Sequence, residues 1–333
     1  MPTIRVILPI LFIALVGGNG CAWIKNTTRS STQKNNPASI HPATGIRSST
    51  PRTEESELQN IFIADNTAIT EVVKWIEENP ALIRSNSNRR ERLAQRIRIR
   101  LDRVRKMYLA FLEKHPNNAR ARAAYGSFLT HIDDQQGALR ELKASAKLAP
   151  FNAAVHNNIA THLGTIAVES GRHTRVGEVL EAYQKSIQLA PRSPLYRHNY
   201  AIALSLFQKK AAAHLKLTPR EVSEEALKQI TEALQLDPNN FEIAADLAET
   251  HHDFKPLPHE QTLAAWKHAA KLATTEDERS WAELQMAIVN IEINHFDEAK
   301  RHLGNVDVKI YAKLKQRLLN AIERTPKQKP AKP

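Results

Sequence analysis

The sequence predicts an all-α protein built from antiparallel helix pairs. In residues 119–152, two runs of apolar residues recur at helical spacing on either side of a polar break, and Pro150 stops the second run. Phrases of the form Leu-x-Pro begin at Leu148, Leu189 and Leu236, and each of them ends one such pair. The chain has 333 residues, is 42% apolar and has only ten glycines, which fits a helical protein with a substantial core.

The helix pair recurs along residues 119–306, in about five copies. Later copies begin at Ala153, Pro194 and Phe241, and a fifth follows. The third copy has a long insertion in its middle turn, near residues 208–220. Self-similarity of this kind indicates a repeat architecture, in which each pair packs mainly on its neighbours.

Signals at the end of the insertion predict where the second helix of the third copy begins. Thr218 is suited to the N-cap, and Pro219 suits the first helical position. Glu221 stands three residues after the cap, where its side chain can bond back to complete a capping box. A helix is therefore expected to start at Pro219.

The first copy resembles a tetratricopeptide repeat, whose period is 34 residues. Gly126, Ala138 and Pro150 match the eighth, twentieth and thirty-second positions of that motif, although Arg122 replaces the aromatic residue of its fourth position. The resemblance implies a right-handed superhelical solenoid in which the first helix of each pair lines a concave groove. It also implies a non-catalytic protein–protein interaction scaffold that binds a peptide or helix in the groove.

The resemblance also implies a set of residues that line the protein-binding groove. They are Asn157, Thr161, His198, Ile202, Glu242, Ala245, Asp246 and Glu249. The three acidic members of this set recur at i, i+4 and i+7 on one helix, where like charges repel by about 0.2–0.5 kcal/mol per pair. We therefore expect this end of the groove to receive a basic segment of a partner.

The same acids, with His252 and Asp253, have spacings that suit a divalent metal. A polar groove face is the favoured interpretation, because metal sites need convergent ligands held by further hydrogen bonds. The sequence has no glycine-rich phosphate loop, nucleophile elbow or paired-cysteine motif. We expect neither a metal nor a cofactor and no catalysis, with an enzyme of unrecognised type as an alternative.

The N-terminal residues predict export and membrane anchoring. Residues 1–21 read as a signal peptide with an apolar run too short to span a bilayer. Gly20-Cys21 resembles a bacterial lipoprotein cleavage box, so Cys21 is expected to be lipidated, with ordinary signal cleavage as the alternative. Residues 22–52 are rich in Ser, Thr, Asn and Pro and predict a disordered tether. These features predict a lipid-anchored protein in the periplasm or cell envelope.

The remaining segments flank the repeats. Residues 53–118 predict a helical segment that contains a degenerate repeat, 307–324 a capping helix and 325–333 a disordered basic tail. The arginine-rich helix at 89–106 suggests an alternative function, binding of a membrane surface or of nucleic acid. Nucleic acid is not expected, because these arginines flank an apolar stripe on both sides, as in a solvated helix face. The net charge of +12 arises mainly outside the repeats, which are near neutral.

Overall fold

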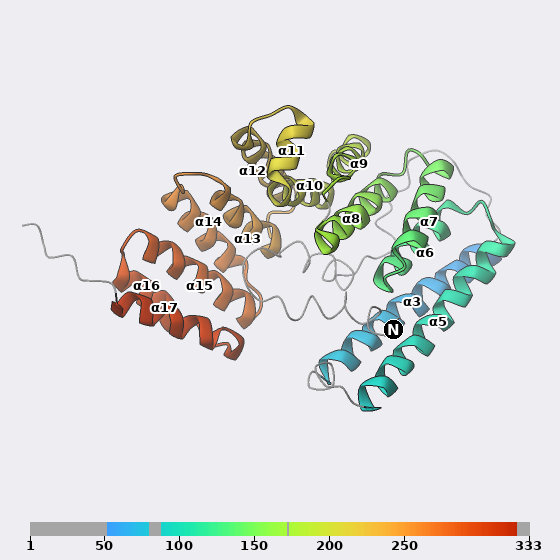
Figure 1. Ribbon diagram of the computed structural model, residues 1–333, viewed down its shortest axis with the longest axis horizontal. Helices are drawn as coiled ribbons and strands as arrows, with labels where there is room; N and C mark the ends of the chain where they lie inside the picture. Colours follow the sequence, from blue (N-terminus) through green and yellow to red (C-terminus); the bar gives the residue numbers. More distant parts are fainter. Residues whose placement is uncertain (1–51, 80–87, 172, 325–333) are drawn as a thin grey trace, which may run out of the picture. The chain divides into compact units, whose positions relative to one another are not determined.

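The computed structural model describes residues 52–79, 88–171 and 173–324 (Figure 1). These residues form fourteen α-helices and two short 3₁₀ helices, and they contain no strand, so the predicted all-α class is confirmed. The expected export signal, Cys21, nearly all of the tether and the basic tail lie outside the described residues. None of the described helices is both long enough and apolar enough to cross a membrane.

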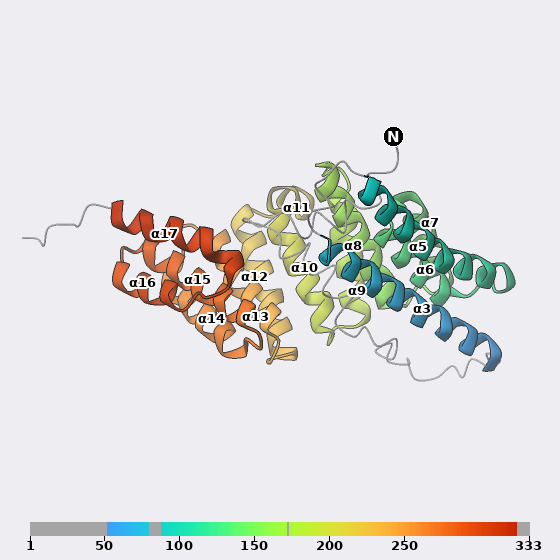
Figure 2. The same cartoon turned by 90° about the horizontal axis from the view of Figure 1, so that it is seen from below.

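The chain divides into two compact units, residues 1–191 and 192–333. The first unit consists of three helix pairs (Figures 1 and 2). Its helices are α3 (Arg52–Glu77), α5 (Asn88–Lys114), α6 (Ala119–His131), α7 (Gln135–Leu148), α8 (Ala153–Ser170) and α9 (Val176–Leu189). In each pair the two helices are consecutive in the chain and pack against each other, as the repeat pattern predicts.

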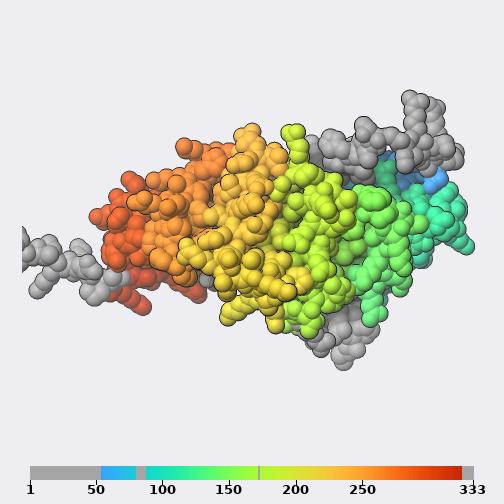
Figure 3. Space-filling model, turned by 90° about the horizontal axis from the view of Figure 1, so that it is seen from above, coloured from blue at the N-terminus to red at the C-terminus, as the bar shows by residue number. Residues whose placement is uncertain are grey.

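The second unit continues the pattern and ends with a single helix. Its elements are α10 (Pro194–Leu206), α11 (Gln208–Leu215), α12 (Pro219–Leu236), α13 (Phe241–Thr250), η2 (His251–Asp253), α14 (His259–Leu272), α15 (Glu276–Glu292), α16 (Phe296–Gly304), η3 (Lys309–Tyr311) and α17 (Ala312–Arg324). The pairs are α10 with α12, α13 with α14 and α15 with α16, and α17 packs on α16 and α15. Figure 3 shows one face of this unit, across which the surface colours follow the order of the chain.

Small residues let the helices of a pair approach closely, as the repeat motif requires. A Cβ at Gly126 of α6 would lie 2.7 Å from Leu142 Cγ and 3.2 Å from the Ala138 carbonyl oxygen, both on α7. Real Cβ atoms do not come so close to another carbon, so only glycine allows this packing without a shift. Gly126 therefore lets α6 and α7 approach closely beside Ala138.

Asparagine residues start the first helix of several pairs. Asn118, Asn152 and Asn240 each follow the proline that ends the preceding pair, and the side-chain oxygen of each accepts a hydrogen bond from backbone N–H groups of the next helix. Such caps satisfy donors that have no partner inside the helix. The turn between pairs thus both stops one helix and starts the next.

The predicted capping box of α12 is present, but the insertion before it is more ordered than a turn. The Thr218 hydroxyl accepts from the Glu221 backbone N–H at 3.2 Å, and Glu221 accepts from the Thr218 N–H at 2.7 Å. The inserted residues form α11, whose end is marked by Lys216 in the left-handed region (φ 56°). Gln208 at its start donates to Ser223 of α12 at 2.7 Å, so the insertion is a short helix bound to its own pair.

The N-terminal pair is a hairpin of two helices longer than those of the repeats. Buried Tyr108 of α5 donates to Asp65 of α3 at 2.7 Å, and Arg100 bonds Glu71 at 2.6 Å. Tyr108 also stacks on Tyr125 of α6, with ring centroids 5.2 Å apart, and so joins the hairpin to the first repeat. The degenerate repeat expected within residues 53–118 falls in this hairpin. Its second helix, α5, is continuous from Asn88 to Lys114.

Candidate functional site

The first helices of neighbouring pairs carry all eight of the groove residues that the sequence predicts. We call the surface of α6 and α8 the first-helix face of the first unit, and that of α10, α13 and α15 the first-helix face of the second unit. Each face lies wholly within one compact unit. Side-chain hydrogen bonds join adjacent first helices in both units, and these bonds fix where the exposed polar groups stand.

In the first unit, α6 and α8 are linked by polar side chains. Asn158 donates to the Ser127 hydroxyl at 3.1 Å. His162 Nε2 donates to the Gln135 carbonyl at 2.8 Å, and Nδ1 lies 2.9 Å from the Thr130 hydroxyl. Burial lowers the pKa of His162, which favours the neutral imidazole.

Of the two groove residues predicted in the first unit, one is buried and one is partly exposed. Asn157 is buried within α8, with 6% of its surface accessible. Thr161 is partly exposed, and its hydroxyl lies 3.0 Å from the Tyr183 hydroxyl of α9. A ligand on this face would therefore contact Thr161, whereas Asn157 would act by holding the helix in place.

In the second unit, a buried hydrogen bond joins α10 to α13. His198 Nε2 donates to Asp246 Oδ2 at 2.6 Å, and the two residues are only 3% and 4% exposed. Charge-assisted hydrogen bonds of this length are stronger than neutral ones. Removing either partner would lose this buried hydrogen bond between the two helices, so the bond fixes α13 against α10.

The position of Asp246 corrects the expectation that three acids share one accessible face. Asp246 is turned into the contact with α10, because its carboxylate is satisfied there by His198. Glu242 and Glu249 are both partly exposed. Ala245 is buried, and Ile202 packs on the core formed by α10, α12 and α13. In the second unit, the ligand-accessible part of the predicted groove is thus Ile202, Glu242 and Glu249.

The metal interpretation required His252 and Asp253 to lie on the same helix as Glu249, and they do not. Helix α13 ends at Thr250, and the next three residues form η2. Burial lowers the pKa of His251 and of His252, and burial raises the pKa of Asp253. No group of three or more potential ligands among residues 52–79, 88–171 and 173–324 is arranged to hold a metal ion.

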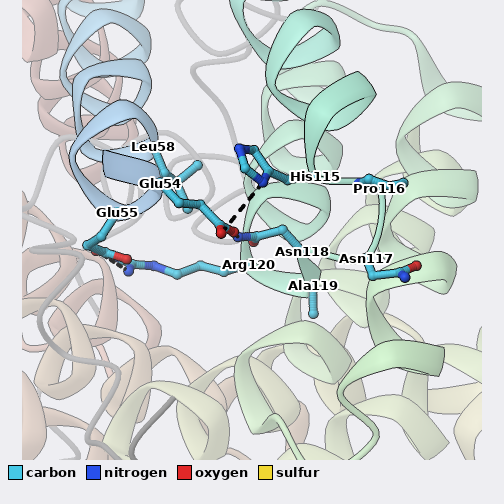
Figure 4. Close-up of a pocket in the computed structure, with 9 residues that line it drawn as sticks. All are labelled: Glu54, Glu55, Leu58, His115, Pro116, Asn117, Asn118, Ala119 and Arg120. Carbon is cyan, nitrogen blue, oxygen red and sulfur yellow. Dashed lines mark hydrogen bonds and ion pairs between the residues drawn. The ribbon is translucent and has the colours of Figure 1, made fainter. Parts of the chain in front are cut away.

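A hollow that sequence reasoning did not identify lies where α3 meets the turn between α5 and α6 (Figure 4). It measures ≈ 550 Å³. Glu54 accepts from Asn118 at 2.8 Å and lies 3.5 Å from His115, and Arg120 donates to Glu55 at 2.6 Å. Because these groups bond one another, the hollow lies at a polar contact between the N-terminal hairpin and the first repeat. The only sequence feature that could have indicated this hollow was the pair of acidic residues, Glu54 and Glu55, at the start of α3.

Comparisons with known proteins identify the fold. No family model matches the chain, and no curated protein matches it. The C-terminal part of a TPR repeat-containing protein from Cytophaga hutchinsonii covers 80% of this chain and 98% of its own length, with a TM-score of 0.52 at 12% identity. PilF of Pseudomonas aeruginosa covers 79% of this chain and 99% of its own length, with a TM-score of 0.49 at 15% identity. A thermophilic TPR protein of Thermus thermophilus covers 62% and 99%, with a TM-score of 0.44 at 15% identity. The repeated helix pairs, the glycine contact and the likeness to the first of these structures establish that the chain is a protein of the tetratricopeptide-repeat fold.

Proposed function

We propose that the protein is a non-catalytic scaffold that binds a peptide or helix of a partner protein on its first-helix faces, at the cell envelope. The observation that carries the proposal is the His198–Asp246 bond at 2.6 Å, which holds α13 against α10, the helix of Ile202, while Glu242 and Glu249 of α13 stay partly exposed. A surface that is ordered before binding loses less conformational entropy when the partner docks.

The chemistry of this face favours a partner with a basic segment. Two carboxylates, Glu242 and Glu249, stand two helical turns apart, which is about 10 Å at 1.5 Å per residue. An extended or helical peptide can place two cationic side chains at that separation. Ile202 would supply apolar contact between α10 and the same peptide. The acids would then act on specificity and association rate more than on affinity alone.

Site-specific photo-crosslinking in the native envelope tests the scaffold proposal. A photoreactive residue is placed at Thr161, at Ile202 or, as the control, at Gln235, which is exposed on α12, the second helix of its pair. We expect discrete protein adducts from Thr161 or Ile202 and none from Gln235. Adducts that form equally from all three positions, or from none of them, would show that the first-helix faces do not bind a protein.

Location at the envelope is proposed from Gly20-Cys21 and the polar segment 22–52. A lipid on Cys21 would place the repeats near a membrane while the segment lets them reach a partner. Cys21→Ser is expected to move the protein from the membrane fraction to the soluble fraction. Wild-type protein that is already soluble after export would rule out lipidation and leave the scaffold proposal untouched.

A further inference from the structure

Helix α5 concentrates positive charge on one side of the first unit. It has ten Arg and Lys residues against three acidic ones. Several of the cations are bound: Arg100 to Glu71 at 2.6 Å, Lys106 to Asp102 at 2.8 Å and Lys114 to Glu57 at 3.0 Å. These ion pairs lie mostly toward the C-terminal half of the helix, so the excess charge lies toward its N-terminal half.

The excess charge forms a straight line on the outer surface of α5. Arg92, Arg96, Ile99 and Arg103 recur at spacings of four, three and four, which places them on one side of the helix over about 16 Å. We call these four residues the arginine stripe. All four are exposed, and they lie on the side of α5 away from Leu101. The guanidinium of Arg96 also lies over the ring of Trp75 of α3, 3.8 Å from its centroid. Arg92 and Arg103 have no acidic partner within the described part of the chain.

We propose that the arginine stripe is a membrane-surface contact that binds the phosphate groups of anionic phospholipids. Arginine presents a planar donor fork that matches phosphate, and basic residues on a helix surface are attracted to anionic lipid. Ile99, 48% exposed at the centre of the stripe, can enter the headgroup region between the flanking arginines.

Lipid fits the stripe better than nucleic acid does. The exposed apolar side chains of α5 are aliphatic, namely Ile99, Met107 and Leu109, while its aromatic residues Tyr108 and Phe111 are buried. Single-stranded nucleic acid is usually held by aromatic rings on which bases stack, and α5 exposes none. The stripe would supply a second membrane signal beside a lipid at Cys21. The proposal depends on α5 alone and does not require that lipid.

Vesicle co-flotation tests the stripe. The chain from residue 22 onward keeps every described residue, and its circular dichroism verifies that it is folded. It is mixed with phosphatidylcholine vesicles with and without phosphatidylglycerol. The test variant is Arg92→Gln with Arg96→Gln and Arg103→Gln. The control changes three exposed cations of α7, Arg140, Lys143 and Lys147, to Gln, with the same change in net charge.

We expect wild type and the α7 control to float with anionic vesicles at low salt and to be released at high salt. At about 1 kcal/mol per arginine, the stripe variant should bind anionic vesicles roughly a hundredfold more weakly. Equal binding of wild type and stripe variant, or equal binding to neutral and anionic vesicles, would overturn the proposal. The proposal would also be overturned if the stripe variant lost more affinity for a DNA duplex or an RNA strand than for vesicles. Glu242→Gln with Glu249→Gln should leave vesicle binding unchanged, which separates this result from any failure of the proposed scaffold.

Discussion

Replacement of Gly126 by alanine tests whether the pairs are held at the distance that the repeat motif requires. In an ordinary helix this change would stabilise the protein by about 1 kcal/mol through helix propensity. Here the new methyl group would lie 2.7 Å from Leu142 Cγ, and Leu142 is only 1% exposed, so it cannot swing into solvent. Overpacking of a buried site costs about 1–3 kcal/mol. Set against the gain in helix propensity, this cost leaves a net loss of up to about 2 kcal/mol.

Urea unfolding followed by circular dichroism measures this loss, with Gly304→Ala as the control. A Cβ at Gly304 meets nothing within 4 Å, so that variant should be neutral or gain a few tenths of a kcal/mol. Leu142→Ala alone should cost about 2–5 kcal/mol. In the double variant, the methyl group at residue 126 would fill part of the cavity, giving a favourable coupling of about 1–2 kcal/mol. If Gly126→Ala is as stable as Gly304→Ala, or if the two changes are additive, the close contact is not a determinant of stability.

The other stability predictions concern a buried carboxyl group and a helix cap. Burial raises the pKa of Asp65 to about 6 from its usual 3.8, even though the hydrogen bond from Tyr108 lowers it. The associated stability is fully present below about pH 4 and is lost as pH rises through 6, by at most about 3 kcal/mol. Asp65→Asn should abolish most of this dependence in urea titrations at several pH values, and an unchanged pH profile would contradict the assignment. Thr218→Ala should cost about 1 kcal/mol and speed amide exchange in the first turn of α12, whereas unchanged exchange would mean that the capping box contributes nothing.

The sequence predicted the helix pairs because their signals are local. Apolar spacing, a small residue such as Gly126 and a terminal proline such as Pro150 act within one pair, and the Thr218 capping box acts within four residues. Such features fix the type and ends of an element without knowledge of its neighbours. The insertion was harder to interpret, because the short helix α11 gains its stability from contacts with α12, including the bond from Gln208 to Ser223.

The candidate site was less predictable, because it depends on which neighbour each helix side meets. Spacing placed Asp246 between Glu242 and Glu249, yet Asp246 bonds His198, 48 residues earlier in the chain. A rotation of about 40–60° around the helix axis separates the inward carboxylate of Asp246 from its accessible neighbours, and periodicity does not resolve that difference. For the same reason, the sequence did not predict the hydrogen bond from Asn118 to Glu54, two residues that are 64 positions apart.

The central claim is that the first-helix face of the second unit receives a basic partner segment, and association kinetics test it most directly. The partner identified by crosslinking at Ile202 is mixed with wild type and with Glu242→Gln plus Glu249→Gln, over a range of salt concentrations. Exposed ion pairs contribute about 0.2–1 kcal/mol each, so the variant should associate about two- to tenfold more slowly at low salt. The two rates should converge at high salt. Equal association rates at low salt would contradict the account and leave the two acids as a solvated surface.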